Sequence, residues 1–534
     1  MPATRNSKIS RISKVFVARH ARKSSSGSLW DTLLVMVVLA IISAAALRYV
    51  YEHGYTLYYG DATAHVNIAR RITDSRTPGF DQLGTVWLPL PHLLTVPLAA
   101  DDRFWRTGLA GAVPAAIGFI LAGTFLFAAA KSVFSSRAAG FAAAGLLALN
   151  PNLLYLQSTP MTEPIFLACL MAVLYFTLLY ERSQSLLAVA GAGLAAMAGT
   201  LTRYEGWFVL AFVAFYLLLV SKRRMLLAGV LFSLIAIAGP LAWLAHNYYY
   251  TGDMLSFYRG PHSAKAIQGA AFYPGRDNWA VAWLQYRTAA RLAIGPALLW
   301  IGLIGAIGAL GKKVIWPLVL LALPPIFYLW SLHSGGTPIF VPTQWPFSYY
   351  NTRYGLALLP LVAFSAAGIV AWTPARLRGI AAIVVIAIGL VPWLMDPRPE
   401  TVITWKESQV NSVARREWTS EAAEFLRANY RPGSGVFTTF GDLTGIFQRA
   451  RIPLRDTLTW DNWPEWPAAV ARPDLFLREE WAVAVGGDPV QTAINRAYLR
   501  GPRYTLQKVI MVKGAPVVEI YRRDSRGGLT AILP

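Results

Sequence analysis

The 534-residue chain contains one cysteine, Cys169, and few charged residues. A single cysteine excludes an intrachain disulfide, and it argues against a cysteine-based metal site and against a thiol nucleophile. Only 14% of the residues are charged, whereas roughly a quarter are charged in soluble globular chains. The deficit of charge therefore predicts a protein embedded in a membrane.

Acidic residues are the scarcer part of this small charged fraction. The chain has 28 Asp and Glu against 49 Lys and Arg, which gives a formal net charge of +21. A strong positive charge can indicate a nucleic-acid partner, but no nucleic-acid-binding motif accompanies it here. Lys and Arg collect in the cytoplasmic loops of membrane proteins by the positive-inside rule. We therefore expect membrane lipids, and no nucleic acid, among the partners.

Hydrophobic residues make up 55% of the chain, and they form runs long enough to cross a bilayer, which takes about 20 residues. About eleven transmembrane helices are expected, at 29–49, 107–130, 138–155, 163–181, 185–202, 206–221, 225–245, 292–310, 314–331, 354–372 and 379–396. The first run also has the small residues of a signal-peptide cleavage site near 43–46. Because the rest of the chain is itself apolar, we expect this run to be retained as a span.

The segments that flank the first span differ from it in composition. Residues 1–28 are polar and basic and are expected to form a disordered cytoplasmic tail. Residues 51–106 contain no clean span and are expected to form interfacial helices on the bilayer surface. The loop charges that fall on the side of the basic N-terminus are Lys131, Arg137, the SKRR stretch at 221–224, Lys312, Lys313, Arg376 and Arg378. With an odd number of spans, the positive-inside rule places residues 51–71 and the C-terminus outside the cytoplasmic membrane.

After Asp396 the composition becomes charged and no further span follows. A transmembrane domain is therefore expected over 29–396 and an extracytoplasmic domain over 397–534. The predicted elements of the second domain are a helix that opens at Ser420, two buried strands and a hairpin that turns at Lys513–Gly514, over 420–430, 436–440, 481–487 and 505–523. The fold class is a polytopic α-helical membrane protein with a C-terminal soluble α/β domain.

The first outer segment places Asp61 four residues before His65 and close to Tyr59. Positions i and i+4 share a helix face, so Asp61 and His65 can address one site. Ionisable groups at the rim of an apolar bundle are expensive and usually functional. Asp61 is equally well explained as the N-cap of a helix that starts at Ala62, and the residues alone leave both interpretations open.

Three further outer loops carry charged residues beside aromatic residues or prolines. They are TPMTEP with Glu163, TRYEGW with Arg203 and Glu205, and SYYNTRYG with Arg353 and Tyr354. Each has a structural explanation as a helix start, a local ion pair or an interfacial anchor. Together they suit attack on an activated sugar carbon, in which a carboxylate takes the acceptor proton and arginine carries the charge of a departing lipid phosphate.

These stretches resemble the GT-C superfamily of integral-membrane glycosyltransferases, and most closely its branch of protein O-mannosyltransferases and lipid A aminoarabinose transferases. The matching motifs are GDATAH (60–65), TPMTEP (159–164), LTRYEG (201–206), NYYYTGDM (247–254) and NTRYGLALLP (351–360). The resemblance implies a GT-C fold and an inverting transfer from a polyprenyl-phosphate sugar donor. The acceptor class, whether glycan, lipid or protein, stays open.

The resemblance also implies residue roles. Asp61 is expected to be the catalytic base and Glu163 a second acidic residue of the site. Arg353, with Arg203 beside it, is expected to bind the donor phosphate. The expected substrate contacts are Tyr59, His65, Glu205 and Tyr354. Many relatives carry an Asp-Glu pair in the first loop, whereas Ala62 follows Asp61 here.

Metal use varies within the superfamily, so a divalent metal is possible. His65, His92 and His262 are candidate ligands, but their spacing does not require a metal. The outer loop 246–291 is long and basic, and long irregular loops are often lids. We expect it to close over the substrate, with Lys265 and Arg276 near the lipid phosphate.

Two other functions are compatible with this composition. One is a transporter or flippase of lipid-linked glycans, and the other is a non-catalytic scaffold that binds cell-wall glycan. Transporters place polar and broken helices near the bilayer midplane. Because the charged residues of this chain lie in the outer loops and no inverted repeat is clear, the enzyme is favoured.

Overall fold

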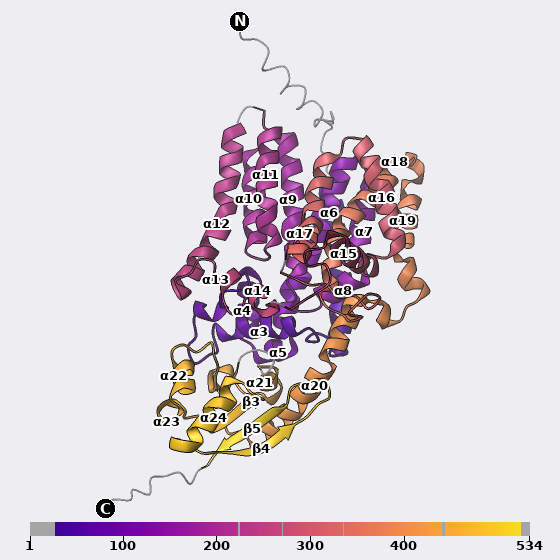
Figure 1. Ribbon diagram of the computed structural model, residues 1–534. Coiled ribbons are helices and arrows are strands. Elements are labelled where there is room, and N and C mark those ends of the chain that lie inside the picture. Colours follow the sequence, from indigo (N-terminus) through magenta and orange to yellow (C-terminus); the bar gives the residue numbers. More distant parts are fainter. Residues whose placement is uncertain (1–26, 223–224, 270, 335, 440–443, 525–534) are drawn as a thin grey trace, which may run out of the picture. The chain divides into compact units, whose positions relative to one another are not determined.

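The computed structural model describes residues 27–222, 225–269, 271–334, 336–439 and 444–524. Except for its last two residues, the basic tail predicted over 1–28 lies outside these ranges. The chain divides into two compact units, whose elements Figure 1 labels. The first comprises Met1–His53, Thr85–Pro91 and Ala112–Glu407, and the second comprises Gly54–Gly84, His92–Gly111 and Ser408–Pro534. The predicted division into domains at 396/397 stays a prediction.

The first unit is a bundle of apolar helices. Seven helices of the described residues are long and apolar enough to cross a membrane: α2 (Gly27–Glu52), α6 (Leu109–Phe134), α9 (Glu163–Ser183), α12 (Met225–Thr251), α17 (Ile315–Ser334), α18 (Leu359–Trp372) with its preceding 3-10 helix η2 (Thr352–Leu358), and α19 (Arg378–Met395) with η3 (Ala375–Leu377). The number rises to nine if two bent pairs count as one span each: α7 (Arg137–Ala148) with α8 (Pro151–Gln157), and α15 (Trp279–Ile294) with α16 (Pro296–Gly311). The chain is a multi-pass membrane protein.

The predicted count of about eleven transmembrane helices is not confirmed. Helices α10 (Leu186–Thr200) and α11 (Glu205–Val220) occupy two of the predicted spans but have only 15 and 16 residues. The predicted loop at 246–291 is also shorter than expected, because α12 runs to Thr251 and α15 begins at Trp279. Two short helices, α13 (Ser256–Arg259) and α14 (Ala264–Gln268), lie between them.

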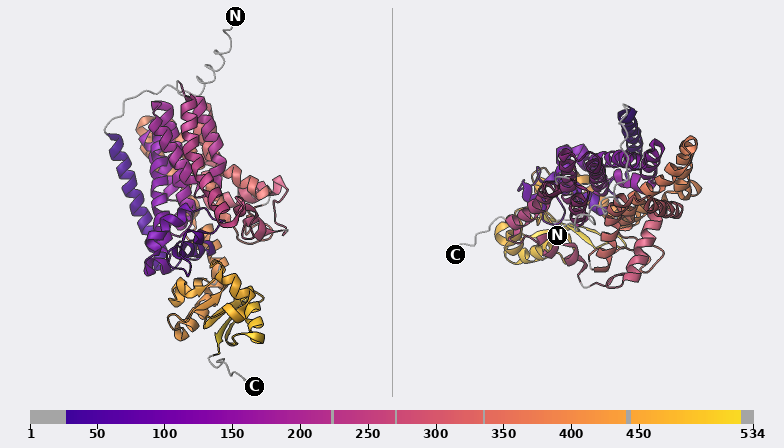
Figure 2. Two further views of the ribbon diagram at one scale, coloured as in Figure 1. Left: turned by 90° about the vertical axis from the view of Figure 1, so that its left-hand side faces the viewer. Right: turned by 90° about the horizontal axis from the view of Figure 1, so that it is seen from above.

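A buried carboxylate fastens one end of the bundle. Asp31 lies at the start of α2 and is 3% exposed, and its carboxylate is 2.6 Å from the Nζ of Lys131 and also pairs with Arg137. The start of α2 therefore lies beside the turn between α6 and α7, as the loop charges predict. Figure 2 shows α2, in indigo, at the periphery of the bundle. Only 22% of the most apolar stretch of α2 is buried within the protein. Most of this hydrophobic helix is therefore left to face lipid.

The second unit contains a five-stranded sheet in the order β2-β1-β3-β5-β4. Its strands are β1 (Val436–Thr438), β2 (Thr457–Leu458), β3 (Trp481–Val485), β4 (Tyr504–Ile510) and β5 (Val518–Arg523). Strand β1 pairs in parallel with β2 and β3, and the β4–β5 hairpin joins β3 antiparallel. The predicted strands and hairpin are confirmed, and Gly514 adopts φ 81° in the turn as a glycine can. The helices that accompany the sheet are α20 (Ile403–Asn429), α21 (Thr444–Ala450), α22 (Glu465–Ala471), α23 (Pro473–Phe476) and α24 (Pro489–Arg500).

The predicted start of the first helix at Ser420 is wrong. Helix α20 begins at Ile403, and Ser420 lies inside it. The stretch from 403 to 429 contains neither glycine nor proline, so nothing interrupts helix propagation before Ser420. Ser is a good N-cap residue, but it is also tolerated inside a helix that packing stabilises.

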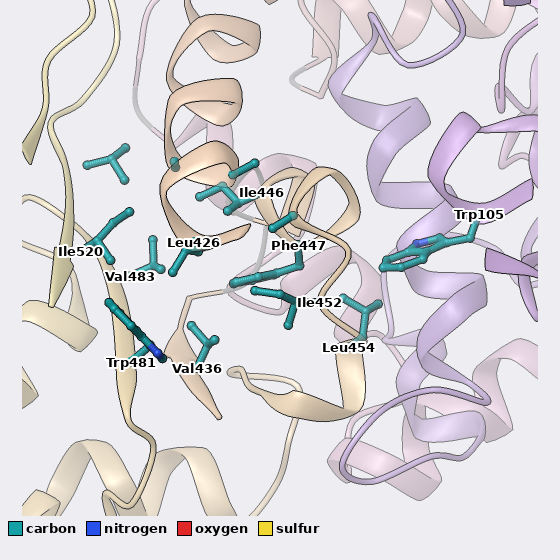
Figure 3. Close-up of a cluster of buried hydrophobic side chains, with 14 of the residues drawn as sticks. Trp105, Leu426, Val436, Ile446, Phe447, Ile452, Leu454, Trp481, Val483 and Ile520 are labelled. Carbon is teal, nitrogen blue, oxygen red and sulfur yellow. The ribbon is translucent and has the colours of Figure 1, made fainter. Parts of the chain in front are cut away.

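The first outer segment packs into the core of this second unit. It forms α3 (Gly60–Arg71), η1 (Phe80–Leu83), α4 (Leu90–Ala99) and α5 (Asp102–Thr107). Val66 and Trp105, both fully buried, share one hydrophobic cluster with Phe447 of α21 and Trp481 of β3 (Figure 3). Asn67 accepts a hydrogen bond from the Trp105 indole at 2.8 Å and donates one to the Thr444 hydroxyl at 2.9 Å. These helices, predicted to be interfacial, are thus held by the C-terminal residues.

Candidate functional site

Three of the predicted motifs meet in the first unit around the carboxylate of Glu163. This residue is the first of α9 and is 8% exposed. Its Oε1 lies 3.2 Å from Nη1 of Arg203 and 3.1 Å from Nε of Arg353. A carboxylate at a helix start also interacts favourably with the helix dipole. The sequence-predicted residues Glu163, Arg203 and Arg353 therefore form one buried ion cluster.

The Arg203 guanidinium donates hydrogen bonds from each of its three nitrogens. It donates from Nε to Glu205 at 2.7 Å, from Nη1 to the Thr162 hydroxyl at 2.8 Å and from Nη2 to the Tyr328 hydroxyl at 2.7 Å. Burial alone lowers the pKa of Arg203, but the negative charges of Glu205 and Glu163 outweigh it and raise that pKa well above its usual range. Arg203 is thus permanently charged and internally paired.

Three positions of the NTRYG motif have structural roles of their own. Asn351 adopts the left-handed conformation at φ 53°, which Asn tolerates well, and donates from Nδ2 to the Pro338 carbonyl at 3.0 Å. Tyr354 stacks on Tyr328 with a centroid distance of 4.4 Å. A Cβ on Gly355 would lie 2.6 Å from the carbonyl carbon of Ala289, so only glycine permits this approach of η2 to α15.

Glu407 completes the cluster, and sequence reasoning missed it. It is 2% exposed and accepts hydrogen bonds from the backbone N–H groups of Asn351 at 3.1 Å and Thr352 at 2.7 Å. Its Oε1 also lies 3.4 Å from Nη1 of Arg353. Burial raises the pKa of Glu407, although the Arg353 charge and these hydrogen bonds oppose the shift. No local pattern distinguishes Glu407 from other charged residues of its helix, so its role follows only from the fold.

The cavity inside this cluster is small. It has a volume of about 20 Å³ and is lined by Glu163, Arg203, Glu205, Tyr328, Arg353 and Tyr354 together with apolar residues. A cavity of roughly 10–15 Å³ is needed for one water molecule, so the space holds a water and not a phosphate group. The carboxylates of Glu163, Glu205 and Glu407 are the countercharges of the two arginines.

The remaining acidic candidate, Asp61, belongs to the second unit. The N-cap residue of α3 is Tyr59, which is buried, so Asp61 lies in the first turn of the helix and not at the cap position that we considered for it. An acid in the first turn still suits the helix dipole. The side chain of Asp61 is partly exposed, and its helix is otherwise among the most buried of the chain.

His65, one turn after Asp61 on α3, contacts His92. Its Nδ1 lies 2.9 Å from Nε2 of His92, and both rings are buried. The structure thus joins two of the three histidines that we considered as metal ligands. Within the described ranges, no three His, Cys, Asp or Glu side chains gather closely enough to hold a metal ion.

The predicted lid residues lie outside the ion cluster. The Nζ of Lys265 lies 4.9 Å from the ring centroid of Tyr258, a cation–π contact within the short helices after α12. The Nε of Arg276 is 3.8 Å from Asp277, which is exposed. Neither arrangement tests the predicted contact with a lipid phosphate, which stays a prediction.

A much larger apolar cavity lies among α15, α16, α17 and α18 of the first unit. Its volume is about 1150 Å³, above the roughly 300–1,000 Å³ of most ligand pockets. Most lining residues are apolar, including Trp283, Trp300, Leu303, Leu329 and Leu361. Arg287 and Arg291, four residues apart on one face of α15, also line it. No carboxylate of the described residues pairs with either arginine.

Sequence reasoning missed Arg287 and Arg291 because both fall in the stretch 246–291, which was predicted to be an irregular loop. The signal was present in the sequence as an i, i+4 basic pair beside aromatic residues. Apolar periodicity from Trp279 to Ile294 would have revealed the helix that presents them.

Comparisons with known proteins agree with this architecture. Residues 104–243 match the sequence profile of a family described as dolichyl-phosphate-mannose-protein mannosyltransferase. No curated protein matches the chain in sequence. Among solved structures, ArnT from Cupriavidus metallidurans bound to undecaprenyl phosphate is similar with a TM-score of 0.55 at 13% identity, over 93% of this chain and 98% of that one. The oligosaccharyltransferase of Archaeoglobus fulgidus is similar with a TM-score of 0.50 at 14% identity, over 86% of this chain and 69% of that one.

Proposed function

We propose that this chain, which has the fold of the GT-C superfamily of integral-membrane glycosyltransferases, transfers a sugar from a polyprenyl-phosphate donor. The acceptor is a glycan, lipid or protein on the extracytoplasmic side of the cytoplasmic membrane. The observation that carries the proposal is the apolar cavity of about 1150 Å³ with two basic residues in its wall. It occurs in a chain whose fold matches that of ArnT solved with undecaprenyl phosphate.

The chemistry of the cavity supports a lipid phosphate as ligand. An isoprenyl chain is apolar and gains free energy in proportion to the area that it buries, about 25 cal/mol per Å². A phosphate is an anion that guanidinium groups bind in a forked geometry. Since Arg287 and Arg291 line the apolar cavity, one wall can address a charged head group while the rest holds the chain.

Asp61 serves as the general base in this proposal. Its carboxylate removes the proton from the acceptor hydroxyl or amine as the acceptor atom attacks the sugar carbon that bears the phosphate. The bond from that carbon to the phosphate oxygen breaks, the polyprenyl phosphate leaves as an anion, and attack from the opposite face inverts the configuration. General-base catalysis by a positioned carboxylate contributes roughly 10²–10⁴-fold.

The rigidity of α3 supports this role for Asp61. Arg415 donates to the Tyr58 carbonyl at 2.6 Å just before the helix, and Arg70 at its end donates to Asp74 at 2.7 Å and to Asp102 at 2.8 Å. Both ends of the short helix are therefore fixed by charged groups. A base that must meet a reacting atom within a fraction of an ångström requires such a support.

The predicted roles of Glu163, Arg203 and Arg353 at the donor phosphate form part of the proposal. Because both arginines are paired with carboxylates, they bind a phosphate only if it replaces Glu163, Glu205 or Glu407 as partner. Glu205 and Tyr354, which line the same cavity, then contact the substrate. Tyr59, the N-cap residue of α3, and His65, one turn after Asp61, contact the substrate beside the base in this proposal.

Asp61→Asn tests the proposal. Asparagine keeps the size and the helix position but cannot accept a proton, so transfer should fall by at least about a hundredfold while the protein still inserts. Mass spectrometry of glycoconjugates in cells that carry either form measures the transferred sugar. Unchanged glycoconjugates in cells that carry the variant would overturn the assignment of Asp61 as the base. A flippase or scaffold forms no glycosidic bond, so purified protein that transfers no sugar in vitro would favour those alternatives.

A further inference from the structure

Asn67 is a fully buried amide on α3, six residues after Asp61 in the second unit. Its Oδ1 accepts a hydrogen bond from the Trp105 indole at 2.8 Å, and its Nδ2 donates one to the Thr444 hydroxyl at 2.9 Å. Trp105 belongs to α5 and Thr444 opens α21. One side chain of α3 therefore joins three helices that come from distant parts of the sequence.

Asn67 lies on a face of α3 that is turned away from Asp61. Thr63 and Asn67 are four residues apart, so they share one helix face, and both are buried. Asp61 comes two residues before Thr63, about 200° round the axis at 3.6 residues per turn, and its side chain is partly exposed. One face of the helix is thus packed into the second unit while the opposite face presents the carboxylate.

Helix α21 packs against the buried face of α3. A Cβ at Gly445 would lie 3.9 Å from Cγ2 of Thr63, so the two helices approach closely. One turn after Thr444, Gln448 donates from Nε2 to the Trp105 carbonyl at 3.3 Å. Trp105 itself belongs to the hydrophobic cluster of the second unit (Figure 3). Helix α21 therefore supports both α3 and α5.

Small rotations of α3 matter because a general base acts only at hydrogen-bond distance from the proton that it removes. A side chain reaches about 5–6 Å from the helix axis, so a rotation of about 10° displaces its end by about 1 Å. A misplacement of about 1 Å can lower a rate roughly a hundredfold. Hydrogen bonds depend on direction, whereas hydrophobic packing does not. The two bonds of Asn67 therefore resist this rotation better than apolar contacts alone.

We propose that Asn67 is a positioning residue for Asp61. It acts through its bonds to Trp105 and Thr444, which fix the rotation of α3 about its axis. The inference rests on the proposed function, in which Asp61 is the base. It also gives the C-terminal α/β residues a part in the reaction, because α21 orients the helix that carries the base.

Substitutions at Thr444 test the bond without changing α3 itself. Thr444→Val keeps a similar shape but removes the hydroxyl acceptor of Asn67, whereas Thr444→Ser keeps a hydroxyl. The readout is the initial rate of glycoconjugate formation in cells that lack the native protein, measured by mass spectrometry after induction and divided by the amount of inserted protein. Thr444→Val should lower this rate about tenfold to a hundredfold, and Thr444→Ser should restore most of it.

Thr438→Val is the matched control. Thr438 is fully buried in β1, and its hydroxyl donates to the Val483 carbonyl at 3.1 Å. The substitution therefore removes a buried hydrogen bond from the sheet of the same unit and leaves the Asn67 bonds intact. Its rate per inserted protein should stay within about twofold of the wild type, since losing such a bond costs stability but does not rotate α3.

Hydrogen exchange of the purified full-length chain shows whether α3 is the element affected. Amides of peptides that cover residues 60–71 should exchange faster in Thr444→Val than in the wild type, because a local opening becomes easier. They should exchange at the wild-type rate in Thr438→Val and close to it in Thr444→Ser. Asn67→Ala, which loses both bonds, should transfer no more sugar than Thr444→Val. The Thr444 variants decide the question if that harsher variant does not insert.

Three results would overturn the proposal. They are wild-type transfer by Thr444→Val, an equal loss in Thr444→Ser or in the Thr438→Val control, and lowered transfer without faster exchange in α3. Asp61→Asn keeps these outcomes separate from the proposed function. If Asp61→Asn loses transfer and Thr444→Val does not, the base stands and the positioning role fails. Full transfer by Asp61→Asn would instead remove the base itself.

Discussion

Glu407 offers the sharpest test of how the ion cluster of the first unit is held together. Its carboxylate accepts the backbone N–H groups of Asn351 and Thr352 and faces Arg353 at 3.4 Å. Glu407→Ala removes the acceptor of two buried N–H groups, and each unsatisfied buried donor costs about 1–3 kcal/mol. The variant should therefore lose on the order of 2–6 kcal/mol of stability.

Glu407→Gln should be much milder. Its side-chain carbonyl still accepts from the backbone donors, so the loss is limited to the interaction with Arg353, on the order of 1–2 kcal/mol. The measurement is the apparent melting temperature of the purified protein in one detergent, with Glu400→Ala, an exposed glutamate of η4 (Pro399–Thr401), as control. A protein of two units need not unfold in one step, so the order of the variants is the criterion. Equal melting of the Ala and Gln variants would refute the reasoning.

The pH dependence of stability provides an independent check on Glu407. Burial raises the pKa of Glu407 in the folded chain, so the folded state binds a proton at this carboxyl more tightly than the unfolded state does. The stabilisation that follows from this difference is complete below the ordinary glutamate pKa of about 4.3. That contribution is lost as the pH rises through the higher folded pKa. Glutamine does not ionise, so the wild type should lose stability relative to Glu407→Gln as the pH rises from about 4.3 through the folded pKa of Glu407. A constant difference between the two proteins would contradict the assignment.

Further predictions concern packing and lipid binding. Gly355→Ala should destabilise the bundle by about 1–3 kcal/mol, because its Cβ would meet the Ala289 backbone at 2.6 Å. The matched control is Gly311→Ala, whose Cβ would have no neighbour within 4 Å, and a melting temperature equal to that of Gly355→Ala would contradict the packing argument. Arg287→Glu should raise KM for a polyprenyl-phosphate donor about tenfold through reversed charge with little change in kcat. Kinetics in proteoliposomes would measure both constants, and an unchanged KM would remove Arg287 from the lipid site.

Much of the fold could be predicted from the sequence because bilayer thickness dictates the length of an apolar run. The β4–β5 hairpin was also predictable, since Gly514 marks the turn between two alternating stretches. Two features were not. The start of α20 at Ile403 follows from the absence of glycine and proline before Ser420. The sequence prediction gave more weight to Ser420 as a good N-cap residue than to this absence. The packing of α3 against α21 depends on contacts such as that of Asn67 with Thr444, which are distant in the sequence.

The candidate site divides in the same way between local and distant information. Glu163, Arg203, Glu205, Arg353 and Tyr354 were predicted from motifs, and the structure brings these five together. The partners that complete the cluster were not predicted, because no local pattern distinguishes them from other residues of their helices. Whether the predicted residues of α3 act with this cluster stays a prediction. The charge environment of each arginine could not be predicted, because it depends on which acids the fold brings near.

That charge environment distinguishes two pairs of arginines among the described residues of the first unit. Arg203 and Arg353 are buried beside carboxylates, and exchanging such a partner for a phosphate requires breaking a buried pair, a change worth roughly 3–5 kcal/mol when one partner is removed. Arg287 and Arg291 of the same unit have no carboxylate partner in the described ranges, so an anion that enters the apolar cavity displaces no internal ion pair. Phosphate should therefore bind first where countercharge is missing, and the paired arginines can contribute only if the substrate supplies the free energy that opens their cluster.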